Sequence, residues 1–351
     1  MGKYGEEDIK YMRRCIDLAL RAEGNTYPNP MVGSVIVHDG KIIGEGYHLK
    51  AGGPHAEVHA IASVKHPELL KDSTIYVSLE PCSHFGKTPP CAQRIIQAGI
   101  PHVVVGCLDS NAKVSGRGIE QLRAAGVDVK VGVLEEECRE LNRRFFTWHE
   151  KHRPYIILKW AETRDGFLDI NRQATVGGRP TWITSEYARR AVHQWRSREQ
   201  AIMVGSNTAL ADNPGLQVRD WTGPNPLRVV IDRNNKLPGG LELFSGKEPT
   251  LLYTSEIVDD GKNVEKVLIN DGEDPIDAVL GELYKRNIQS LIVEGGSQLL
   301  SRFIERNLWD EARVFVGQMD FGDGIKAPAI KGQLIDFTHF DNSILYMYRN
   351  I

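Results

Sequence analysis

The sequence predicts an α/β protein with two domains, each built on a sheet that helices cover. The chain has 351 residues, and a single hydrophobic core stops growing at about 250–300 residues. In both halves, short apolar runs rich in β-branched residues alternate with helical patterns, which is typical of sheets with helices on both faces. A polar stretch that contains a proline, Thr147 to Pro154, lies between the halves. We therefore expect one domain over residues 1–148 and a second over residues 153–351.

The first half predicts a hairpin followed by repeated units of helix and strand. Ile9, Met12 and Ile16 recur at helical spacing and predict a helix over 7–22. The turn residues Asp39-Gly40 separate two apolar runs and predict the hairpin. Further apolar runs, and glycines that follow helical patterns, predict the remaining elements: strands over 31–37, 41–47, 74–79, 101–107 and 127–131, and helices over 55–65, 89–99 and 118–126.

The second half repeats this logic after Pro154. Apolar runs such as Leu227 to Ile231 predict buried strands, and longer amphipathic stretches predict helices. We expect strands over 155–160, 200–204, 227–231, 250–254, 290–294 and 312–316, and helices over 185–197, 275–287 and 297–306.

Charge and hydropathy exclude several classes of protein. The 43 basic and 46 acidic side chains leave a formal net charge of −3, which argues against a strongly basic nucleic-acid surface. The mean hydropathy is −0.33, and no run approaches the ~18 apolar residues of a membrane span. The polar, acidic start lacks the features of a signal peptide, and five cysteines argue against a disulfide framework. We expect a cytoplasmic protein that binds neither membrane nor nucleic acid.

A pattern of metal-binding residues stands out in the first half. His55-Ala56-Glu57 is followed by Pro81-Cys82 and, after eight intervening residues, by Cys91. Zinc prefers imidazole and thiolate ligands, and three protein ligands leave one position for water. A carboxylate close to the ligand histidine can take a proton from that water and return it to a leaving group. His-x-Glu with Pro-Cys and a later Cys is the pattern of zinc deaminases.

Other interpretations of these residues exist. His55 and His59 are four residues apart on one helix face, as in zinc proteases, but that motif needs Glu directly after the first His, where Ala56 stands. We therefore expect His59 to pack or to support a ligand. Taken singly, the two cysteines are also compatible with ordinary buried thiols.

Two patterns in the second half indicate a nucleotide or phosphate site. In Leu291 to Gln298 an apolar strand leads through a glycine pair into a helix, whose first N–H groups can bind phosphate. This is not the GxGxxG fingerprint, and a purely structural turn remains the alternative. Arg196 and Arg219 are suited to hold a phosphate, with exposed, unliganded arginines as the alternative.

These segments resemble one family across nearly the whole chain. TYPNPMVGSVIV, GPHAEVHA and EPCSHFGKTPPC look like the deaminase half of the bifunctional riboflavin-biosynthesis deaminase/reductases, and the wide spacing of the cysteines separates this family from cytidine and transfer-RNA deaminases. The order LKWAETRDG, WITS, HQWR, VGSNTALADNP, LQVR, VID and VEGG is similar to the reductase half. The resemblance implies an N-terminal cytidine-deaminase-like α/β/α sandwich and a C-terminal dihydrofolate-reductase-like α/β domain.

The resemblance also implies roles for individual residues. His55, Cys82 and Cys91 would bind one Zn2+, Glu57 would be the proton shuttle, and Asn29 would contact the substrate ring. Contacts to NADPH are implied for Ala161, Trp182, Thr208, Asp212, Gly296, Ser297, Gln298 and Leu299, and contacts to a ribose-phosphate substrate for Lys159, Arg196, Leu216, Arg219 and Glu294. For His84 and Lys87, ring or phosphate contacts and a solvated loop are both open, and the remaining thiols, Cys15, Cys107 and Cys138, are expected to be ordinary reduced cysteines.

The expected function is deamination of a phosphorylated diaminopyrimidinone, followed by NADPH-dependent reduction of its ribosyl group to a ribityl chain. We expect a homo-oligomer, a dimer or a tetramer. The alternatives are a zinc deaminase with a vestigial reductase domain, a deaminase of nucleic acids, and a scaffold without activity. Three residues depart from the family pattern in the reductase half, namely Arg164, Pro180 and Asn213.

Overall fold

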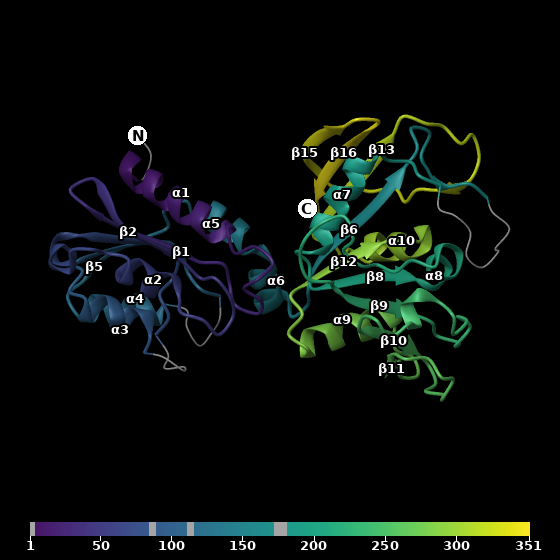
Figure 1. Cartoon of the computed structure of the whole chain (residues 1–351), viewed down its shortest axis with the longest axis horizontal. Helices are drawn as coiled ribbons and strands as arrows, with labels where there is room; N and C mark the ends of the chain where they lie inside the picture. The colour runs from purple at the N-terminus through teal and green to yellow at the C-terminus, as the bar shows by residue number, and fades with distance from the viewer. Residues whose placement is uncertain (1–3, 84–88, 111–115, 172–180) are drawn as a thin grey trace. The chain divides into compact units, whose positions relative to one another are not determined.

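The computed structural model describes residues 4–83, 89–110, 116–171 and 181–351. The chain divides into two compact units, Met1–His152 and Arg153–Ile351, and Figure 1 shows that each has its own sheet. Among the described residues, none of the helices combines the length and apolar character that crossing a membrane requires.

The first unit is a five-stranded sheet between two layers of helices (Figure 1). The strand order is β2-β1-β3-β4-β5, with β1 antiparallel to both of its neighbours and β3, β4 and β5 parallel. The strands are β1 (Gly33–His38), β2 (Lys41–Tyr47), β3 (Thr74–Leu79), β4 (His102–Cys107) and β5 (Asp128–Val131). The helices are α1 (Glu6–Leu20), α2 (Ala56–Ala62), the 3-10 helix η1 (Pro67–Asp72), α3 (Cys91–Gln97), α4 (Arg117–Ala124), α5 (Glu135–Leu141) and α6 (Arg143–Lys151).

Alternation along the strands builds a core on each face of this sheet. Ile36, between Val35 and Val37 in β1, packs with residues of α2, α3 and α4, whereas its two neighbours pack with α1, α5 and α6. Successive side chains of a strand point to opposite faces, so uninterrupted apolar strands of this kind are covered on both sides. The expected α/β/α sandwich is confirmed.

Glycines of β2 allow α2 to lie directly against the sheet. A Cβ added at Gly46 would be 2.4 Å from the Ala60 nitrogen and 2.5 Å from the Ala56 oxygen. At Gly44 it would be 2.5 Å from the Ala60 oxygen. All three contacts are with the backbone of α2, so a side chain at either position would push the helix away.

The second unit is built on a nine-stranded sheet of order β11-β10-β9-β8-β12-β6-β13-β16-β15. The strands from β11 to β13 are parallel, and β16 and β15 add antiparallel at one edge. The sheet contains β6 (Tyr155–Glu162), β8 (Ala201–Gly205), β9 (Leu227–Ile231), β10 (Thr250–Thr254), β11 (Glu265–Leu268), β12 (Ser290–Glu294), β13 (Glu311–Gly317), β15 (Gln333–Phe340) and β16 (Ser343–Arg349). The other elements are the small pair β7 (Phe167–Asp169) and β14 (Ile325–Lys326), the helices α7 (Glu186–Arg196), α8 (Ser206–Asp212), α9 (Pro275–Lys285) and α10 (Ser297–Glu305), and the 3-10 helix η2 (Glu242–Phe244).

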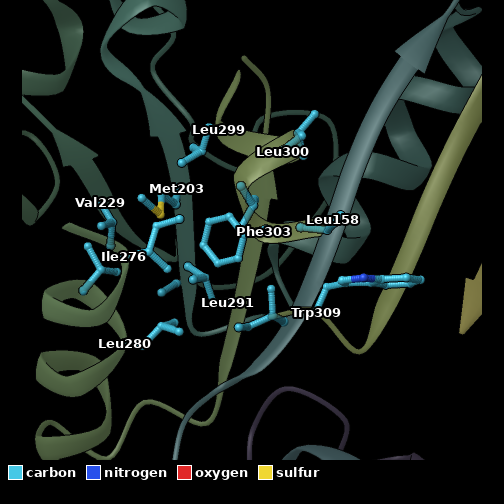
Figure 2. Packing of buried hydrophobic residues seen from close by; sticks show 14 of the residues in the cluster. Leu158, Met203, Val229, Ile276, Leu280, Leu291, Leu299, Leu300, Phe303 and Trp309 are labelled. Carbon is cyan, nitrogen blue, oxygen red and sulfur yellow. The ribbon is translucent and has the colours of Figure 1, made fainter. Parts of the chain in front are cut away.

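Helices cover both faces of this sheet as well. Phe303 of α10 and Ile276 of α9 pack on one face around Met203 and Leu291 (Figure 2). On the other face, Ala209 of α8 lies in a second cluster with strands β6, β8, β9, β10 and β12, and α7 packs near β13 and β16.

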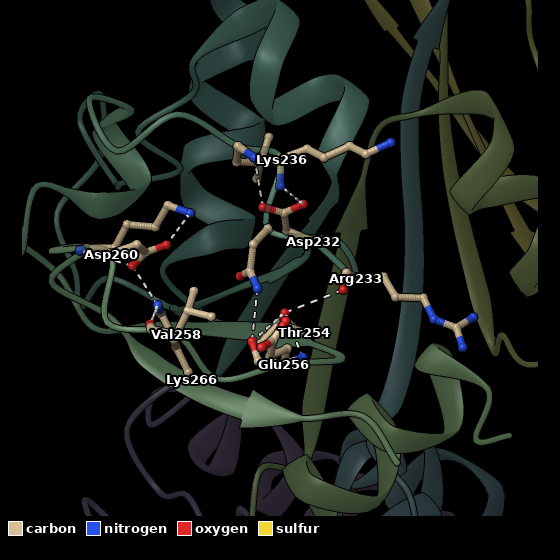
Figure 3. A network of polar contacts seen from close by, with 11 residues as sticks. Asp232, Arg233, Lys236, Thr254, Glu256, Val258, Asp260 and Lys266 are labelled. Atoms are coloured by element: carbon tan, nitrogen blue, oxygen red, sulfur yellow. Dashed lines mark hydrogen bonds and ion pairs between the residues drawn. The ribbon is translucent and has the colours of Figure 1, made fainter. Parts of the chain in front are cut away.

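Polar contacts fix the loops after β9 and β10 (Figure 3). The Asp232 carboxylate accepts hydrogen bonds from the backbone N–H groups of Lys236 and Leu237 at 2.9 and 2.8 Å. The Asn235 side-chain amide donates to the Glu256 carbonyl at 2.9 Å. These bonds hold a loop at the carboxyl end of the parallel strands, which is the edge where α/β sheets bind ligands.

Several elements differ from those expected. The polar stretch after Thr147 suggests a linker, but α6 continues to Lys151 and buries Phe145 and Phe146 in the core of the first unit. A short helix with one apolar stripe has many polar residues, and this explains why α6 resembles a linker in the sequence. The sequence patterns also do not predict α5, α8, β7, β11, β14, β15 and β16.

Candidate functional sites

Three separate segments of the first unit bring His55, Cys82 and Cys91 together. His55 is the N-cap of α2, Cys82 follows β3, and Cys91 is the first residue of α3. One potential ligand atom from each residue lies within 4.8 Å of the others. The His55 Nδ1 atom is 3.5 Å from the Cys82 Sγ and 3.3 Å from the Cys91 Sγ.

These distances fit a tetrahedral zinc ion. Zn–S and Zn–N bonds of ~2.3 and ~2.1 Å at a tetrahedral angle place nitrogen and sulfur ~3.6 Å apart. Hydrogen bonds from the Cys91 thiol and from His55 lower the pKa of Cys82. The backbone N–H of Cys91 also donates a hydrogen bond to the Cys82 Sγ at 3.3 Å. Cys82 is thus prepared to be a thiolate, the form that binds metal.

Glu57 lies in the first turn of α2, buried beside this cluster. It is only 3% exposed. Burial, and then the negative charge of Cys82, raise the pKa of Glu57 to about 7. A carboxyl group with a pKa near neutrality can both accept and return a proton, as general acid–base catalysis requires.

Asn29 is oriented by a buried histidine, His48, that no sequence pattern singles out. The His48 Nδ1 lies 3.0 Å from the Pro54 carbonyl, so this nitrogen carries the proton and donates. The His48 Nε2 then accepts from the Asn29 side-chain amide at 3.1 Å. Burial lowers the pKa of His48 and favours this neutral form. The contact with His48 therefore uses the Asn29 Nδ2 and leaves its Oδ1 as an acceptor.

Glu80 anchors a loop to the segment that carries Cys82. Its buried carboxylate accepts backbone hydrogen bonds from Asp109, Gly116 and Gly118 at 3.3, 2.9 and 3.0 Å. A sequence pattern could have indicated Glu80, because this acidic residue directly precedes Pro81-Cys82 at the end of an apolar strand.

In the second unit, Lys159, Arg196 and Glu294 form a buried charged cluster. Lys159 and Glu294 are paired neighbours on β6 and β12, and α7 brings Arg196 to them. The Arg196 Nε and Nη2 donate to the Glu294 carboxylate at 2.8 and 2.7 Å, and the Lys159 Nζ lies 3.6 Å from it. Burial alone would raise the pKa of Glu294, but the two positive charges outweigh it and hold this pKa at about 2.

The two arginines expected at a phosphate, Arg196 and Arg219, differ in exposure and in the partners of their guanidinium groups. Arg196 is engaged with Glu294, and its Nη1 donates to the Gln217 carbonyl at 3.3 Å. Arg219 is exposed, and within the described ranges its guanidinium makes no hydrogen bond or ion pair. Of the two, Arg219 is the one whose guanidinium is open to a ligand.

Arg219 ends a loop with two residues in the left-handed backbone region. Asn213 caps α8 at φ 42°, and Leu216 is buried at φ 55°. Asparagine tolerates this region well, so the departure at Asn213 suits the backbone there. Its Oδ1 also accepts from the Glu242 backbone N–H at 2.7 Å.

The glycine turn before α10 lies against Thr208 of α8. Gly295 and Gly296 have φ of 93° and 77°, and a Cβ at Gly296 would be 3.2 Å from the Thr208 Oγ1. The Ser297 hydroxyl donates to the Lys326 carbonyl at 2.7 Å. Gln298 is exposed, whereas the Leu299 side chain is in the core (Figure 2). The structure thus brings Thr208 and this turn together.

The other residues expected at NADPH lie on β6, on α8 and in the segment before α7. Ala161 is in β6 opposite Phe315 of β13, and Asp212 is the last residue of α8. Trp182 is 55% exposed, with the Arg189 guanidinium 4.4 Å from its ring centroid. His84, Lys87 and Pro180 lie outside the described residues, and the departure at Arg164 forms an ion pair with Asp320.

Two family models match the chain. Residues 5–107 match the cytidine and deoxycytidylate deaminase zinc-binding region. Residues 154–343 match the RibD C-terminal domain.

Known proteins are similar over almost the full length. The riboflavin biosynthesis protein RibD of Aquifex aeolicus is 43% identical over 326 residues, covering 91% of this chain and 89% of that protein. RibD of Escherichia coli is 38% identical over 330 residues, covering 88% and 87%. The crystal structure of a diaminohydroxyphosphoribosylaminopyrimidine deaminase/5-amino-6-(5-phosphoribosylamino)uracil reductase from Thermotoga maritima has a TM-score of 0.88 at 37% identity, covering 98% of this chain and 99% of that chain.

These matches confirm a deaminase-like unit followed by a reductase unit, with Zn2+ and NADPH as cofactors. The chain belongs to the RibD family of bifunctional deaminase/reductases of riboflavin biosynthesis.

Proposed function

We propose that residues 1–148 deaminate 2,5-diamino-6-(5-phosphoribosylamino)pyrimidin-4(3H)-one and that residues 153–351 reduce the product with NADPH. Water replaces a ring amino group, which leaves as ammonia, and reduction then opens the ribosyl group into a ribityl chain. One observation carries the proposal: a buried carboxyl group, Glu57, lies beside a His–Cys–Cys cluster in one unit, and the other unit holds a separate buried cluster of charged groups.

In the deaminase, His55, Cys82 and Cys91 would hold zinc, and the bound ion would supply the Lewis acidity that activates water. Glu57 takes the proton from the attacking water and delivers it to the departing amino group. Its raised pKa suits both transfers. Asn29 presents its Oδ1 to N–H donors of the pyrimidine ring because His48 holds its amide.

In the reductase, the charged cluster contacts the ribose. Glu294 is ionised at neutral pH, so it accepts hydrogen bonds from ribose hydroxyls and has no proton to donate. The Lys159 ammonium is the neighbouring group with N–H donors, and Arg196 keeps the Glu294 carboxylate in place. Arg219, with its open guanidinium, binds the phosphate, and the backbone at Leu216 shapes the same loop.

The glycine turn before α10 would hold NADPH, which would supply the hydride. Gly296, Ser297, Gln298 and the backbone of Leu299 offer N–H groups at a helix start, which suits a diphosphate. Thr208 lies against this turn, and Ala161, Trp182 and Asp212 are assigned the remaining contacts.

We further propose a cytoplasmic homo-oligomer that does not bind nucleic acid. The described cysteines are all free thiols, as a reducing compartment favours, and the net charge of −3 disfavours a phosphate backbone as partner. β15 supports self-association, because this edge strand exposes Leu334, Ile335 and Phe337 by 48, 41 and 57%.

Glu57→Gln tests the deaminase assignment. Amide nitrogen and oxygen cannot shuttle the proton, so we expect ammonia release to fall about 10²–10⁴-fold. Zinc content, measured by elemental analysis, and NADPH oxidation with the deaminated intermediate should remain unchanged. Glu120→Gln, an exposed position on α4, is the matched control and should have no effect.

Undiminished ammonia release in the Glu57→Gln protein would remove this residue from the mechanism. The same assays separate the alternative with a vestigial reductase, which predicts ammonia release from the wild type without oxidation of NADPH.

A further inference from the structure

His193 is a buried histidine of the reductase unit that is not among the residues proposed to contact substrate or cofactor. It lies on α7, one turn before Arg196, and is 4% exposed. Its Nδ1 accepts a hydrogen bond from the backbone N–H of Arg219 at 3.2 Å. The imidazole therefore contacts the backbone of the residue whose guanidinium is open to a ligand.

The hydrogen bonds define the tautomer of His193. Because Nδ1 accepts, the proton must be on Nε2, and Nε2 faces the Asp220 carboxylate at 3.4 Å. Burial, followed by the positive charge of Arg196, lowers the pKa of His193. A protonated ring would have no acceptor for the Arg219 N–H.

The loop from Asn213 to Arg219 is held at several backbone groups. The buried Arg228 donates to the Gly215 carbonyl at 3.4 Å, and Arg196 donates to the Gln217 carbonyl. The Asn225 side chain accepts from the Val218 N–H at 2.7 Å. His193 supplies the last of these contacts, directly at Arg219.

We propose that His193 is a positioning residue for the reductase: its neutral ring fixes the backbone of Arg219, so that the guanidinium is held where the substrate phosphate binds. The inference rests on the proposed reductase function, in which Arg219 binds that phosphate. Because the backbone of Arg219 is already fixed, less conformational entropy is lost when the substrate phosphate binds. Loss of the acceptor also removes the protein partner of the part-buried Arg219 N–H, so this end of the loop is held less firmly.

His193→Leu and His193→Asn form a matched pair that tests this role. Both side chains are shorter than histidine, but only the Asn Oδ1 keeps an acceptor close to the place of Nδ1. In the full-length protein we expect His193→Leu to raise the reductase KM for the phosphorylated intermediate about tenfold, with kcat and the Kd for NADPH within twofold of wild type. His193→Asn should restore KM to within about threefold, and ammonia release should be unchanged in both.

Arg219→Ala separates the positioning role from the substrate role. It should raise KM by itself, and His193→Leu should add less than twofold in the Arg219→Ala background, because the two changes act through one contact. If Arg219→Ala raises KM and His193→Leu alone does not, or if the two effects multiply, the positioning role is wrong while the proposed function stands. An unchanged KM in Arg219→Ala would instead contradict the substrate role of Arg219, and the inference with it.

A surface variant keeps the test available if His193→Leu fails to fold. Asp220 is half exposed, and Asp220→Ala removes the carboxylate that Nε2–H faces while leaving the core intact. We expect a two- to threefold increase in KM. If His193→Leu is unfolded, a KM of Asp220→Ala equal to that of wild type would mean that the contact is structural only and would overturn the proposal.

Discussion

Glu294 is a buried carboxylate that two cations keep ionised. Its pKa is about 2, below the ordinary 4.5, although burial acts in the opposite direction. Removing one member of such a cluster leaves buried charge without compensation, which is costly to the folded state. The charge of Glu294 thus contributes to stability as well as to the proposed ribose contacts.

Glu294→Gln should make the stability of the second unit less dependent on pH. A depressed pKa stabilises the fold above pH 4.5, and this contribution is lost as the pH falls from 4.5 to about 2. The shift corresponds to about 3 kcal/mol, so we expect the variant to be less stable by about that amount at pH 7 and similar to wild type near pH 2.

Urea unfolding followed by tryptophan fluorescence measures this difference, since Trp160, Trp195 and Trp309 are in the second unit. Glu305→Gln, exposed on α10, serves as the control. A stability difference that stays constant from pH 7 to pH 3 would contradict the ion-pair explanation.

Some functional residues can be predicted from the sequence, and others cannot. His55, Glu57, Cys82 and Cys91 form a short pattern with its own chemistry, so the order of residue types is enough to predict them, and the fold brings the three potential ligand atoms together. The acceptor roles of His48 and His193 cannot be predicted in this way. Each depends on a backbone group that only the folded loop brings within hydrogen-bond distance.

At the scale of elements, the position of α2 depends on the glycines of β2. This helix carries His55 at its N-cap and Glu57 in its first turn, so its distance from the sheet sets the geometry of the metal cluster. Ordinary strand propensity disfavours glycine, and the close approach of α2 explains why glycine is present.

Gly46→Ala should therefore displace α2. The new Cβ would be 2.4 Å from the Ala60 nitrogen, and overpacking of this kind costs about 1–3 kcal/mol. We expect zinc content and ammonia release to fall together, while NADPH oxidation with the deaminated intermediate is retained.

Gly281→Ala on α9 is the corresponding control, because no heavy atom lies within 4 Å of the added Cβ. Alanine is favoured in a helix by roughly 0.5–1 kcal/mol, so stability should be equal or slightly higher. Normal zinc binding in Gly46→Ala would show that α2 tolerates the displacement.

Elements were predictable where their pattern was strong. The apolar runs at 227–231 and 250–254 predict strands with the bounds that β9 and β10 have. β15 has no such signal, because its residues from Gln333 to His339 are exposed on both faces, and strand periodicity requires one buried face. The pairing of β15 with β16 places it in the sheet, which is a tertiary effect.

At the scale of the whole molecule, the exposed edge strand bears on assembly. We expect the wild type to sediment as a multiple of the 39.3-kDa chain, and Phe337→Lys to shift the mass towards the monomer, because a charge on an edge strand opposes pairing. Analytical ultracentrifugation measures this. Ile257→Lys, at a residue that is 59% exposed in the loop after β10, should leave the mass unchanged, and a monomeric wild type would rule out the oligomer.

The two units have separate cores and separate candidate sites, and the proposed zinc ligands belong to only one of them. They come from three segments, around residues 55, 82 and 91, so a bound metal would act as a cross-link that favours the folded state. By mass action, the stability of this unit then increases with the concentration of free zinc. We therefore expect removal of zinc to destabilise the first unit and to lower ammonia release, while the second unit, which has its own core, stays folded.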